Sequence, residues 1–343
     1  MTLLSTPKEP SRITLAHGGG GRAMRRLIDE VFATAFANPD FSDEDQARLT
    51  LPGEGRVAFT TDGFVVDPLE FPGGDIGTLA VNGTVNDLAV GGARPLWLSC
   101  AVIVEEGTDR ALLERIAGSM RKAADAAGVR IVTGDTKVVH KGAADKLFVT
   151  TSGVGLIPAR RDLRAEYARP GDVILVNGPL GDHGAAIMAA RGDMALMCPV
   201  ESDCAPLNHL MEALIEAAPG TRAARDATRG GLASTLNEIA TASGHGISLE
   251  ETSLPVRDEV RGLCEILGLD PLYLANEGTL AAVVPPEEAD AALAAMQSTA
   301  QGRGARIVGH VTEKHPGQVV MQTLFGGGRV VDMLAGEQLP RIC

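Results

Sequence analysis

Hydrophobic residues recur along the first half of the chain with the spacings of helices and strands. Apolar side chains at helical intervals, from Met24 to Phe32, predict an amphipathic helix over 22–36. Residues 71–95 begin with a Gly-rich turn and continue as a helix whose small side chains allow a close approach to a sheet. A further helix is predicted at 109–128, and strands are predicted at 56–66 (interrupted at Thr61-Asp62-Gly63), 95–105, 129–139 and 146–157.

A polar, proline-punctuated stretch at 158–172 separates this pattern from a second one. The second half predicts strands at 172–178, 276–284 and 305–325, and helices after 178, within 226–244, and at 207–218, 259–268 and 286–297. Neither half shows the strict βαβ alternation of a doubly wound sheet, so we expect two α+β domains. The expected units are a Gly-rich arm with its helix (1–37), a first domain (38–160), a second domain (168–325) and a flexible tail (326–343).

Composition narrows the class of protein. Lys and Arg number 31 against 44 Asp and Glu, a net charge of −13, which is a poor match for nucleic acid or an anionic membrane. No run of eighteen apolar residues predicts a membrane span, and the N-terminus lacks the apolar core of a signal peptide. We therefore expect a cytoplasmic protein.

The five cysteines form no metal or disulfide pattern. They are Cys100, Cys198, Cys204, Cys264 and Cys343, an odd number without a CxxC pair. Cys100 and Cys264 fall in a strand and a helix, where cysteine behaves as a small apolar residue. Cys343 is different because it ends the chain in "PRIC". It is either an accident of sequence or a thiol kept at a reachable tip.

Three aspartates stand beside glycine or small polar residues: Asp62 in "TTDG", Asp87 in "VNDLA" and Asp135 in "TGDTK". Carboxylates of this kind hold Mg²⁺ together with substrate phosphates. Taken alone, each is more readily a turn or capping residue, and the three together strengthen the metal interpretation. Spacing alone leaves both interpretations open.

Two further residues are candidates for proton transfer. Lys137 follows Asp135 by two positions, so both side chains lie on one face of a strand. Lys137 either forms a surface ion pair with Asp135, or it stabilises the negative charge of a bound phosphate and transfers a proton. Glu277 in "ANEGTL" precedes an apolar strand, and is either a solvated turn residue or a base delivered into a cleft.

No GxxxxGK[ST] phosphate-binding loop is present. The "HGGGG" run at 17–21 has no strong strand before it, so it is no dinucleotide fingerprint. It predicts either a flexible linker or a mobile flap that offers backbone N–H groups to an anion.

In their order along the chain, these segments resemble the PurM-like ATP-binding superfamily, which includes aminoimidazole ribonucleotide (AIR) synthetase and selenophosphate synthetase. The segments are "HGGGGRAM", "TDGFVVDPLEFPGGDIG", "NGTVNDLAVGGARP", "VTGDTKVV", "DATRGGL", "ANEG" and "PRIC". Within the superfamily, the chain is most similar to the HypE family of hydrogenase expression/formation proteins, which are carbamoyl dehydratases. Gly63 departs from the hydroxyl residue expected after "TD".

The resemblance implies a two-domain α+β fold, with an N-terminal ATP-binding domain, a C-terminal α/β sandwich and a dimer formed through the N-terminal domains. It implies that Asp62, Asp87 and Asp135 hold ATP with Mg²⁺. Asn86, Gly74 and Asp226 are expected to contact ATP as well. Lys137 and Glu277 correspond to the residues that remove protons, and Cys343 corresponds to the carrier thiol.

The reaction implied is dehydration of a carbamoyl group on Cys343. A carbamoyltransferase, HypF, loads the thiol; ATP activates the amide oxygen; and loss of phosphate leaves a thiocyanate for the iron site held by a HypC–HypD complex. Two rival functions remain at this stage. One is a superfamily enzyme acting on a free small molecule, and the other is a scaffold or metallochaperone without catalysis.

Overall fold

A computed structural model of the chain describes residues 12–37, 46–192, 199–334, 336, 339 and 341–343. The first half forms a four-stranded sheet in the order β1-β6-β4-β5. Its strands are β1 (Arg56–Phe64), β4 (Arg94–Glu105), β5 (Arg130–Val139) and β6 (Leu147–Ile157), and only β4 and β5 run parallel. The two-stranded ribbon of β2 (Glu70–Phe71) and β3 (Gly74–Asp75) stands beside it.

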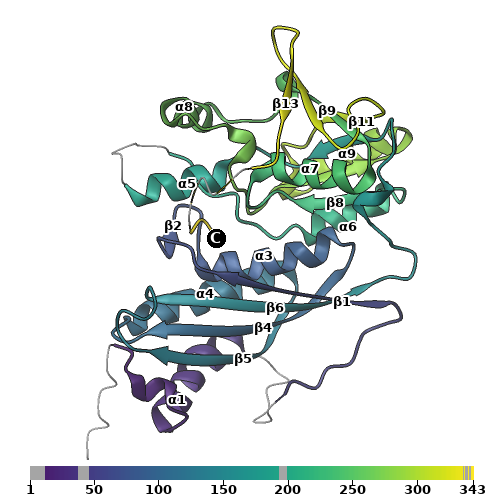
Figure 1. Cartoon of the computed structure of the whole chain (residues 1–343). Helices are drawn as coiled ribbons and strands as arrows, with labels where there is room; N and C mark the ends of the chain where they lie inside the picture. Colours follow the sequence, from purple (N-terminus) through teal and green to yellow (C-terminus); the bar gives the residue numbers. More distant parts are fainter. Residues whose placement is uncertain (1–11, 38–45, 193–198, 335, 337–338, 340) are drawn as a thin grey trace, which may run out of the picture.

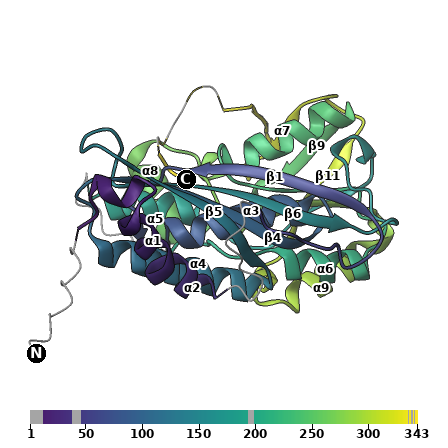
Figure 2. The same cartoon turned by 90° about the horizontal axis from the view of Figure 1, so that it is seen from below.

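Helices α3 (Ile76–Val90) and α4 (Arg110–Ala127) cover one face of this sheet. Asp75 and Asp109 cap the two helices through their side chains. The predicted helix at 22–36 is present as consecutive segments, α1 (Arg22–Leu27), a π-helical stretch (Ile28–Ala33) and α2 (Thr34–Phe36), which lie against α4 (Figure 2).

The second half forms a seven-stranded sheet in the order β13-β12-β9-β11-β7-β10-β8. The strands are β7 (Val173–Val176), β8 (Ala223–Asp226), β9 (Gly246–Glu250), β10 (Leu280–Val284), β11 (Arg306–Thr312), β12 (Val319–Gln322) and β13 (Gly328–Val331). The helices are α5 (Asp182–Arg191), α6 (Asn208–Ala217), α7 (Gly231–Ser243), α8 (Asp258–Leu267) and α9 (Ala289–Gln297). α7 packs on one face of the sheet, and α6 with α9 packs on the other.

α3 lies between the two halves (Figure 1). It touches the first sheet on one side and α6 and β8 on the other, so 13 of its 15 residues are buried. This double burial explains the small residues that the sequence places there. Gly83, for example, leaves room for the Phe64 ring, whose nearest carbon would lie 3.0 Å from an added Cβ.

The other face of the first sheet carries no helix among the described residues. Along β1 the residues alternate, with Phe64 buried and Phe59 and Val57 exposed at 69% and 57% of their surface. Ile103 of β4 is exposed on the same face. The result is a partly apolar, uncovered sheet surface.

Two local differences from the sequence-based expectation follow from strand pairing. β1 is not interrupted at Thr61-Asp62-Gly63, because each of these residues pairs with β6. Gly328–Val331 pairs with β12, so the sheet continues past residue 325, where the tail was expected to begin. No helix in the described part of the chain is long and apolar enough to cross a membrane.

Candidate functional site

Two carboxylates of the first domain face the second domain. Asp62 points from β1 toward α3, and Asp87 lies in the last turn of α3. Thr60 Oγ1 donates a hydrogen bond to Asp87 Oδ2 at 2.8 Å. Burial raises the pKa of both groups, and the negative charge of Asp62 raises the pKa of Asp87 further.

The second domain adds two carboxylates to the same cleft. Asp226 ends β8, and burial together with the charges of Asp87 and Asp62 raises its pKa to about 7. Glu277 is 4% exposed, and burial together with Asp203, Asp226 and Asp62 holds its pKa well above the usual range. Its Oε1 is buried without a hydrogen bond. Glu277 is therefore not the solvated turn residue that the sequence allowed.

This concentration of carboxylates suits a bound cation. Mg²⁺ is usually held by one or two carboxylates and by the phosphates it accompanies. Among the described residues, no group of three His, Cys, Asp or Glu side chains is arranged to hold a metal ion alone. Asp62 and Asp87 therefore fit a Mg²⁺ that is shared with a phosphate-bearing ligand. Arg229 opposes the negative charge, because it lowers the pKa of both Asp62 and Glu277.

Asp135 and Lys137 lie elsewhere in the chain. They occupy β5, the edge strand opposite β1, and both are exposed while Thr136 between them is buried. Lys137 Nζ lies 2.8 Å and 2.7 Å from the two Asp135 oxygens, as their spacing predicted. This bond lowers the pKa of Asp135. The expected trio of Asp62, Asp87 and Asp135 is therefore not assembled within one chain, because the sheet separates its members.

Asn86 and Gly74, both expected to contact ATP, have clear packing roles. Asn86 Nδ2 donates to the carbonyl oxygens of Ala205 (3.1 Å) and Glu277 (3.3 Å), and its Oδ1 accepts from Leu207 N at 2.8 Å. This buried amide joins α3 to the second domain. Gly74 lies against the Phe71 ring, 3.0 Å from where its Cβ would stand. Their contacts with ATP stay predictions.

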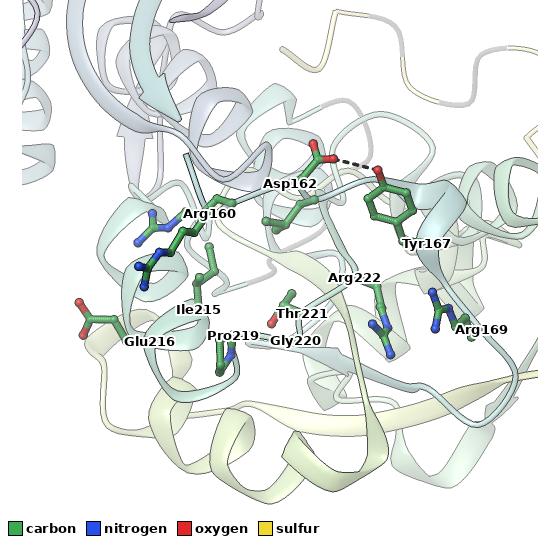
Figure 3. A pocket seen from close by; sticks show the side chains of 12 residues that line it. Arg160, Asp162, Tyr167, Arg169, Ile215, Glu216, Pro219, Gly220, Thr221 and Arg222 are labelled. Carbon is green, nitrogen blue, oxygen red and sulfur yellow. Dashed lines mark hydrogen bonds between the residues drawn. The ribbon is translucent and has the colours of Figure 1, made fainter. Parts of the chain in front are cut away.

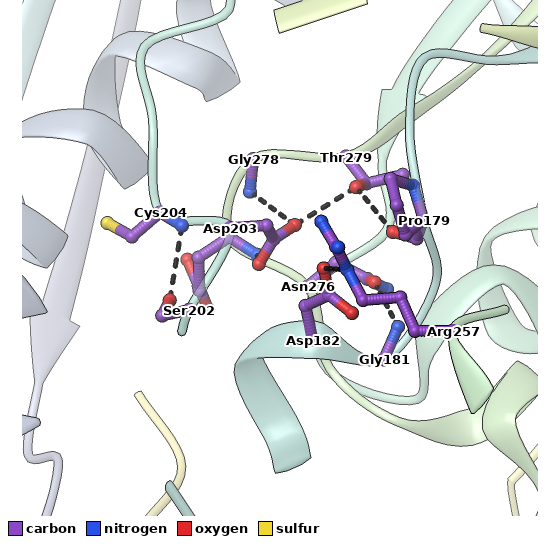
Figure 4. A network of polar contacts seen from close by, with 11 residues as sticks. Pro179, Gly181, Asp182, Ser202, Asp203, Cys204, Arg257, Asn276, Gly278 and Thr279 are labelled. Carbon is purple, nitrogen blue, oxygen red and sulfur yellow. Dashed lines mark hydrogen bonds and ion pairs between the residues drawn. The ribbon is translucent and has the colours of Figure 1, made fainter. Parts of the chain in front are cut away.

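Asp203, which the sequence did not single out, bonds to the segment that contains Glu277, and Figure 4 shows its contacts with Gly278 and Thr279. Asp203 accepts hydrogen bonds from Glu277 N (2.9 Å), Gly278 N (3.0 Å) and Thr279 Oγ1 (3.0 Å). The next residue, Cys204, receives a weak hydrogen bond from Asn82 Nδ2 at 3.5 Å, and burial raises its pKa well above the usual value. Cys204 is thus held as a neutral thiol. Cys198 lies outside the described residues.

The C-terminal residues are docked between the two domains. Val65 N donates to Cys343 O and Asp67 N donates to Arg341 O, both at 3.2 Å, so the last residues pair with the chain just beyond β1. Arg191 Nη2 donates to Arg341 O at 2.9 Å. Arg341 itself forms an ion pair with Asp145. Ile342 is 4% exposed and packs in the core of the first domain, and Cys343 packs beside it.

His183 of α5 holds the tail from the second domain. Its Nε2 lies 2.8 Å from Ile342 O, and its Nδ1 lies 2.8 Å from Ser202 Oγ. Because a carbonyl only accepts, Nε2 must carry the proton and Nδ1 must accept from Ser202. Burial lowers the His183 pKa to about 4, so the ring is neutral. The segment 202–204 thereby bonds both to Glu277 and to the histidine that holds the tail.

Sequence reasoning missed His183, Asp203, Arg191 and the role of Arg229. Arg229 stands in "DATRGGL", a segment already marked by the resemblance. For the others, the sequence carried no local signal, because their partners lie 74 to 159 residues away.

Comparisons with known proteins define the class first. Residues 43–157 match the N-terminal domain model of AIR synthase related proteins, and residues 169–322 match the C-terminal domain model. The chain is therefore a two-domain protein of the AIR synthase related, PurM-like class.

The particular family follows from closer relatives. The chain is 66% identical over 337 residues to the carbamoyl dehydratase HypE of Rhodobacter capsulatus, covering 97% of this chain and 98% of that one. A crystal structure of the hydrogenase maturation protein HypE in complex with ATP superposes with a TM-score of 0.92, at 50% identity and with coverage of 96% and 99%. A HypE–HypF complex structure matches at a TM-score of 0.79 and 46% identity, covering 90% and 99%. The chain belongs to the HypE family of carbamoyl dehydratases, enzymes of hydrogenase maturation.

Proposed function

We propose that the chain uses ATP to dehydrate a carbamoyl group carried on its own Cys343. The balanced step is S–C(=O)–NH₂ plus ATP giving S–C≡N, ADP, phosphate and a proton. The amide oxygen leaves as part of phosphate, and both N–H protons are removed. The thiocyanate is the source of the cyanide ligand for the iron of [NiFe]-hydrogenase.

The observation that carries this proposal is the docked tail. The backbone of Cys343 is bonded to Val65, three residues beyond Asp62, and the tail is also held by α5 of the second domain. A free small-molecule kinase has no need for a terminal thiol beside its carboxylate cleft. A scaffold without catalysis has no need for the buried Glu277, whose charge is costly to hold there.

Glu277 is the proposed base. Its raised pKa gives it more affinity for an amide proton than an exposed glutamate has, and its Oε1 is buried without a protein partner. Asp203 fixes the backbone of Glu277. Glu277 therefore takes a proton from the carbamoyl nitrogen once the oxygen is phosphorylated.

Asp62 and Asp87 are the proposed holders of Mg²⁺ and ATP in each chain, with Asp226 and Arg229 across the cleft. A bound Mg²⁺ ion neutralises charge on the phosphoryl group during its transfer. Asn86, on α3, and Gly74, on β3 just before that helix, border this region.

A homodimer would complete the site. The uncovered face of the first sheet carries exposed Phe59, Val57 and Ile103 together with the Asp135–Lys137 pair. A second copy that covers this face buries the apolar residues. It also brings its own β5 edge, with Asp135 and Lys137, toward the β1 edge that carries Asp62. In this arrangement Lys137 serves the tail of the other chain.

Partners follow from the chemistry of the thiol. The carbamoyl group has to come from a carbamoyltransferase, and HypF fills this role in the proposal because a HypE relative is known in complex with HypF. The cyanide acceptor is a HypC–HypD complex. The tail must leave the docked position for both steps, in the cytoplasm.

Intact-mass measurement tests the function. After incubation with the carbamoyltransferase, carbamoyl phosphate and ATP, the protein should gain about 43 Da and then lose about 18 Da, both on the C-terminal peptide. Cys343→Ala should show neither change, while Cys264→Ala, which removes a buried cysteine, serves as the control. Modification of any other residue, or ATP turnover on a free small molecule without tail modification, would contradict the proposal.

The ATP site is tested by calorimetry. Asp87→Ala should lower the affinity for Mg·ATP by at least about 100-fold, because a carboxylate bound to the cation and coupled to Asp62 is lost. Asp125→Ala, which removes an exposed carboxylate paired with Arg121 in α4, should bind normally. An unchanged affinity in Asp87→Ala would remove Asp87 from the site.

A further inference from the structure

An arginine-lined hollow lies outside the cleft, at the linker between the two domains. It has a volume of about 710 Å³ and is bounded by the linker 160–169 and by residues 215–222, from the end of α6 to the start of β8 (Figure 3). Asp226 ends β8, so the hollow is at the opposite end of that strand from the carboxylate cleft. Four arginines line it, in a chain whose net charge is −13.

Only part of this positive charge is neutralised locally. Arg161 is committed to Glu212 through two hydrogen bonds of 2.7 Å and 2.5 Å. Asp162 is occupied by Arg56 and by the Tyr167 hydroxyl. In the described part of the chain, the guanidinium groups of Arg160 and Arg169 have no ion pair or hydrogen bond.

Arg169 and Arg222 both line the hollow, and Figure 3 draws their side chains. Arg222 Nε is buried without a hydrogen bond, and lies 3.6 Å from the buried Asp172 Oδ2. That same carboxylate oxygen already accepts from Arg169 N at 2.8 Å. Asp172 is therefore an ion-pair partner of the Arg222 guanidinium, whereas it meets Arg169 through the backbone N–H. The Arg169 guanidinium, which cannot lose its proton, keeps its full positive charge, and a bound anion would neutralise it.

We propose that this hollow binds a small phosphate-bearing molecule. Guanidinium groups match phosphate oxygens in geometry and charge, so Arg169 and Arg222 would hold a phosphate or diphosphate group. Leu163, Ile215 and Pro219 add apolar surface for an uncharged part of the ligand. The volume lies within the range of small-ligand pockets. The ligand is either a free oligophosphate or the phosphate end of a nucleotide.

Binding at this position would fix the linker more firmly against the second domain. Arg56 donates to Arg161 O at 2.7 Å, which ties the linker to β1, and Arg164 N donates to Arg222 O at 2.8 Å, which ties it to β8. A ligand on Arg222 and Arg169 connects the residue just before β8 to the end of the linker. We therefore expect bound anion to slow proteolysis of residues 158–170.

The test uses the Asp87→Ala protein, so that ATP-site binding does not mask the hollow. Calorimetric titrations with pyrophosphate and with ADP, without Mg²⁺, should give saturable binding that weakens as NaCl is raised. Arg169→Gln should weaken it at least 10-fold. Arg222→Lys, which keeps the charge but loses the planar fork, should also weaken it. Arg115→Gln, which removes an exposed arginine paired with Glu70, is the matched control.

Comparing pyrophosphate with ADP distinguishes a free oligophosphate from the phosphate end of a nucleotide as the ligand. Equal affinity for pyrophosphate and ADP means that only the phosphate groups are recognised, and tighter ADP binding means that the apolar surface contributes. Absence of saturable binding, or binding unchanged by Arg169→Gln, overturns the proposal. Preferential binding of a polyglutamate peptide would overturn it as well, in favour of a protein partner. Circular dichroism melting confirms that each variant is folded.

Discussion

A heterodimer of one Lys137→Ala chain and one Glu277→Gln chain should form cyanated Cys343, although neither homodimer does so. The reason is the position of the two residues in a single chain. Lys137 stands on β5, on the uncovered face of the first sheet, whereas Glu277 lies beyond α3, on the helix-covered side. If Lys137 serves the partner's tail, one of the two sites in the mixed dimer retains both wild-type residues.

Each single variant should still accept a carbamoyl group, since loading requires only the thiol. Each should lose conversion by about 100-fold or more, the usual effect of removing a group that transfers a proton. The heterodimer, purified with two different tags, should recover about half of the wild-type rate per dimer, since one site of two is intact. Lys146→Ala, a lysine in the turn before β6, provides the control.

A heterodimer as inactive as its parents would place Lys137 and Glu277 in one chain's site and contradict the proposed arrangement. Sedimentation of the wild type as a monomer at micromolar concentration and above would contradict it independently. Wild-type conversion by either homodimer would remove that residue from catalysis. The same purified wild type, two homodimeric variants and heterodimer therefore distinguish these three outcomes.

His183→Ala should release the tail and slow dehydration without preventing carbamoyl loading. The His183 ring donates to Ile342 O and accepts from Ser202, so its loss removes two buried hydrogen bonds at the docked tail. Of these two bonds, the one to Ile342 O joins the tail, so at about 1 kcal/mol for a net hydrogen bond the ratio of docked to released tail should fall about 5-fold. Alkylation of Cys343 should accelerate by about the same factor, while conversion slows.

His183→Gln separates positioning from mere folding, because a glutamine amide can donate from near the position of Nε2. It should restore part of the protection of Cys343. His209→Ala, which removes an exposed ring bonded to Ala126 O, is the matched control. Unchanged alkylation and conversion rates in His183→Ala would show that the tail does not depend on this residue.

The lowered pKa of His183 predicts that the free energy of unfolding depends on pH. The unfolded chain protonates His183 near pH 6.5, but the folded chain does so only near pH 4. The folded state is therefore favoured above pH 6.5, and loses this advantage as the pH falls toward 4, by up to about 3 kcal/mol. Urea unfolding of His183→Gln should lack this component, so the difference in free energy of unfolding between the two proteins should change with pH below 6.5 and become constant above pH 7.

The sequence determined most of the secondary structure, because helix and strand periods reflect each residue's immediate neighbours. The small-residue helix α3 was predictable from its composition, and the Asp135–Lys137 contact followed from the alternation of a strand. The order of motifs and the terminal Cys343 were sufficient to indicate the family. These are all properties of segments of fewer than about 20 residues, or of their order.

Only the tertiary structure decided which of these residues meet. The turn residue Glu277 is buried because Asp203 and Asn86 bond its backbone, from 74 and 191 positions away. Asp135 is separated from Asp62 because β5 and β1 are opposite edges of the sheet, which no local pattern specifies. The tail docks because His183 and Val65 offer one donor each to its carbonyl oxygens. Local periodicity records which face of an element is apolar, whereas the choice of partner for that face depends on packing across the whole chain.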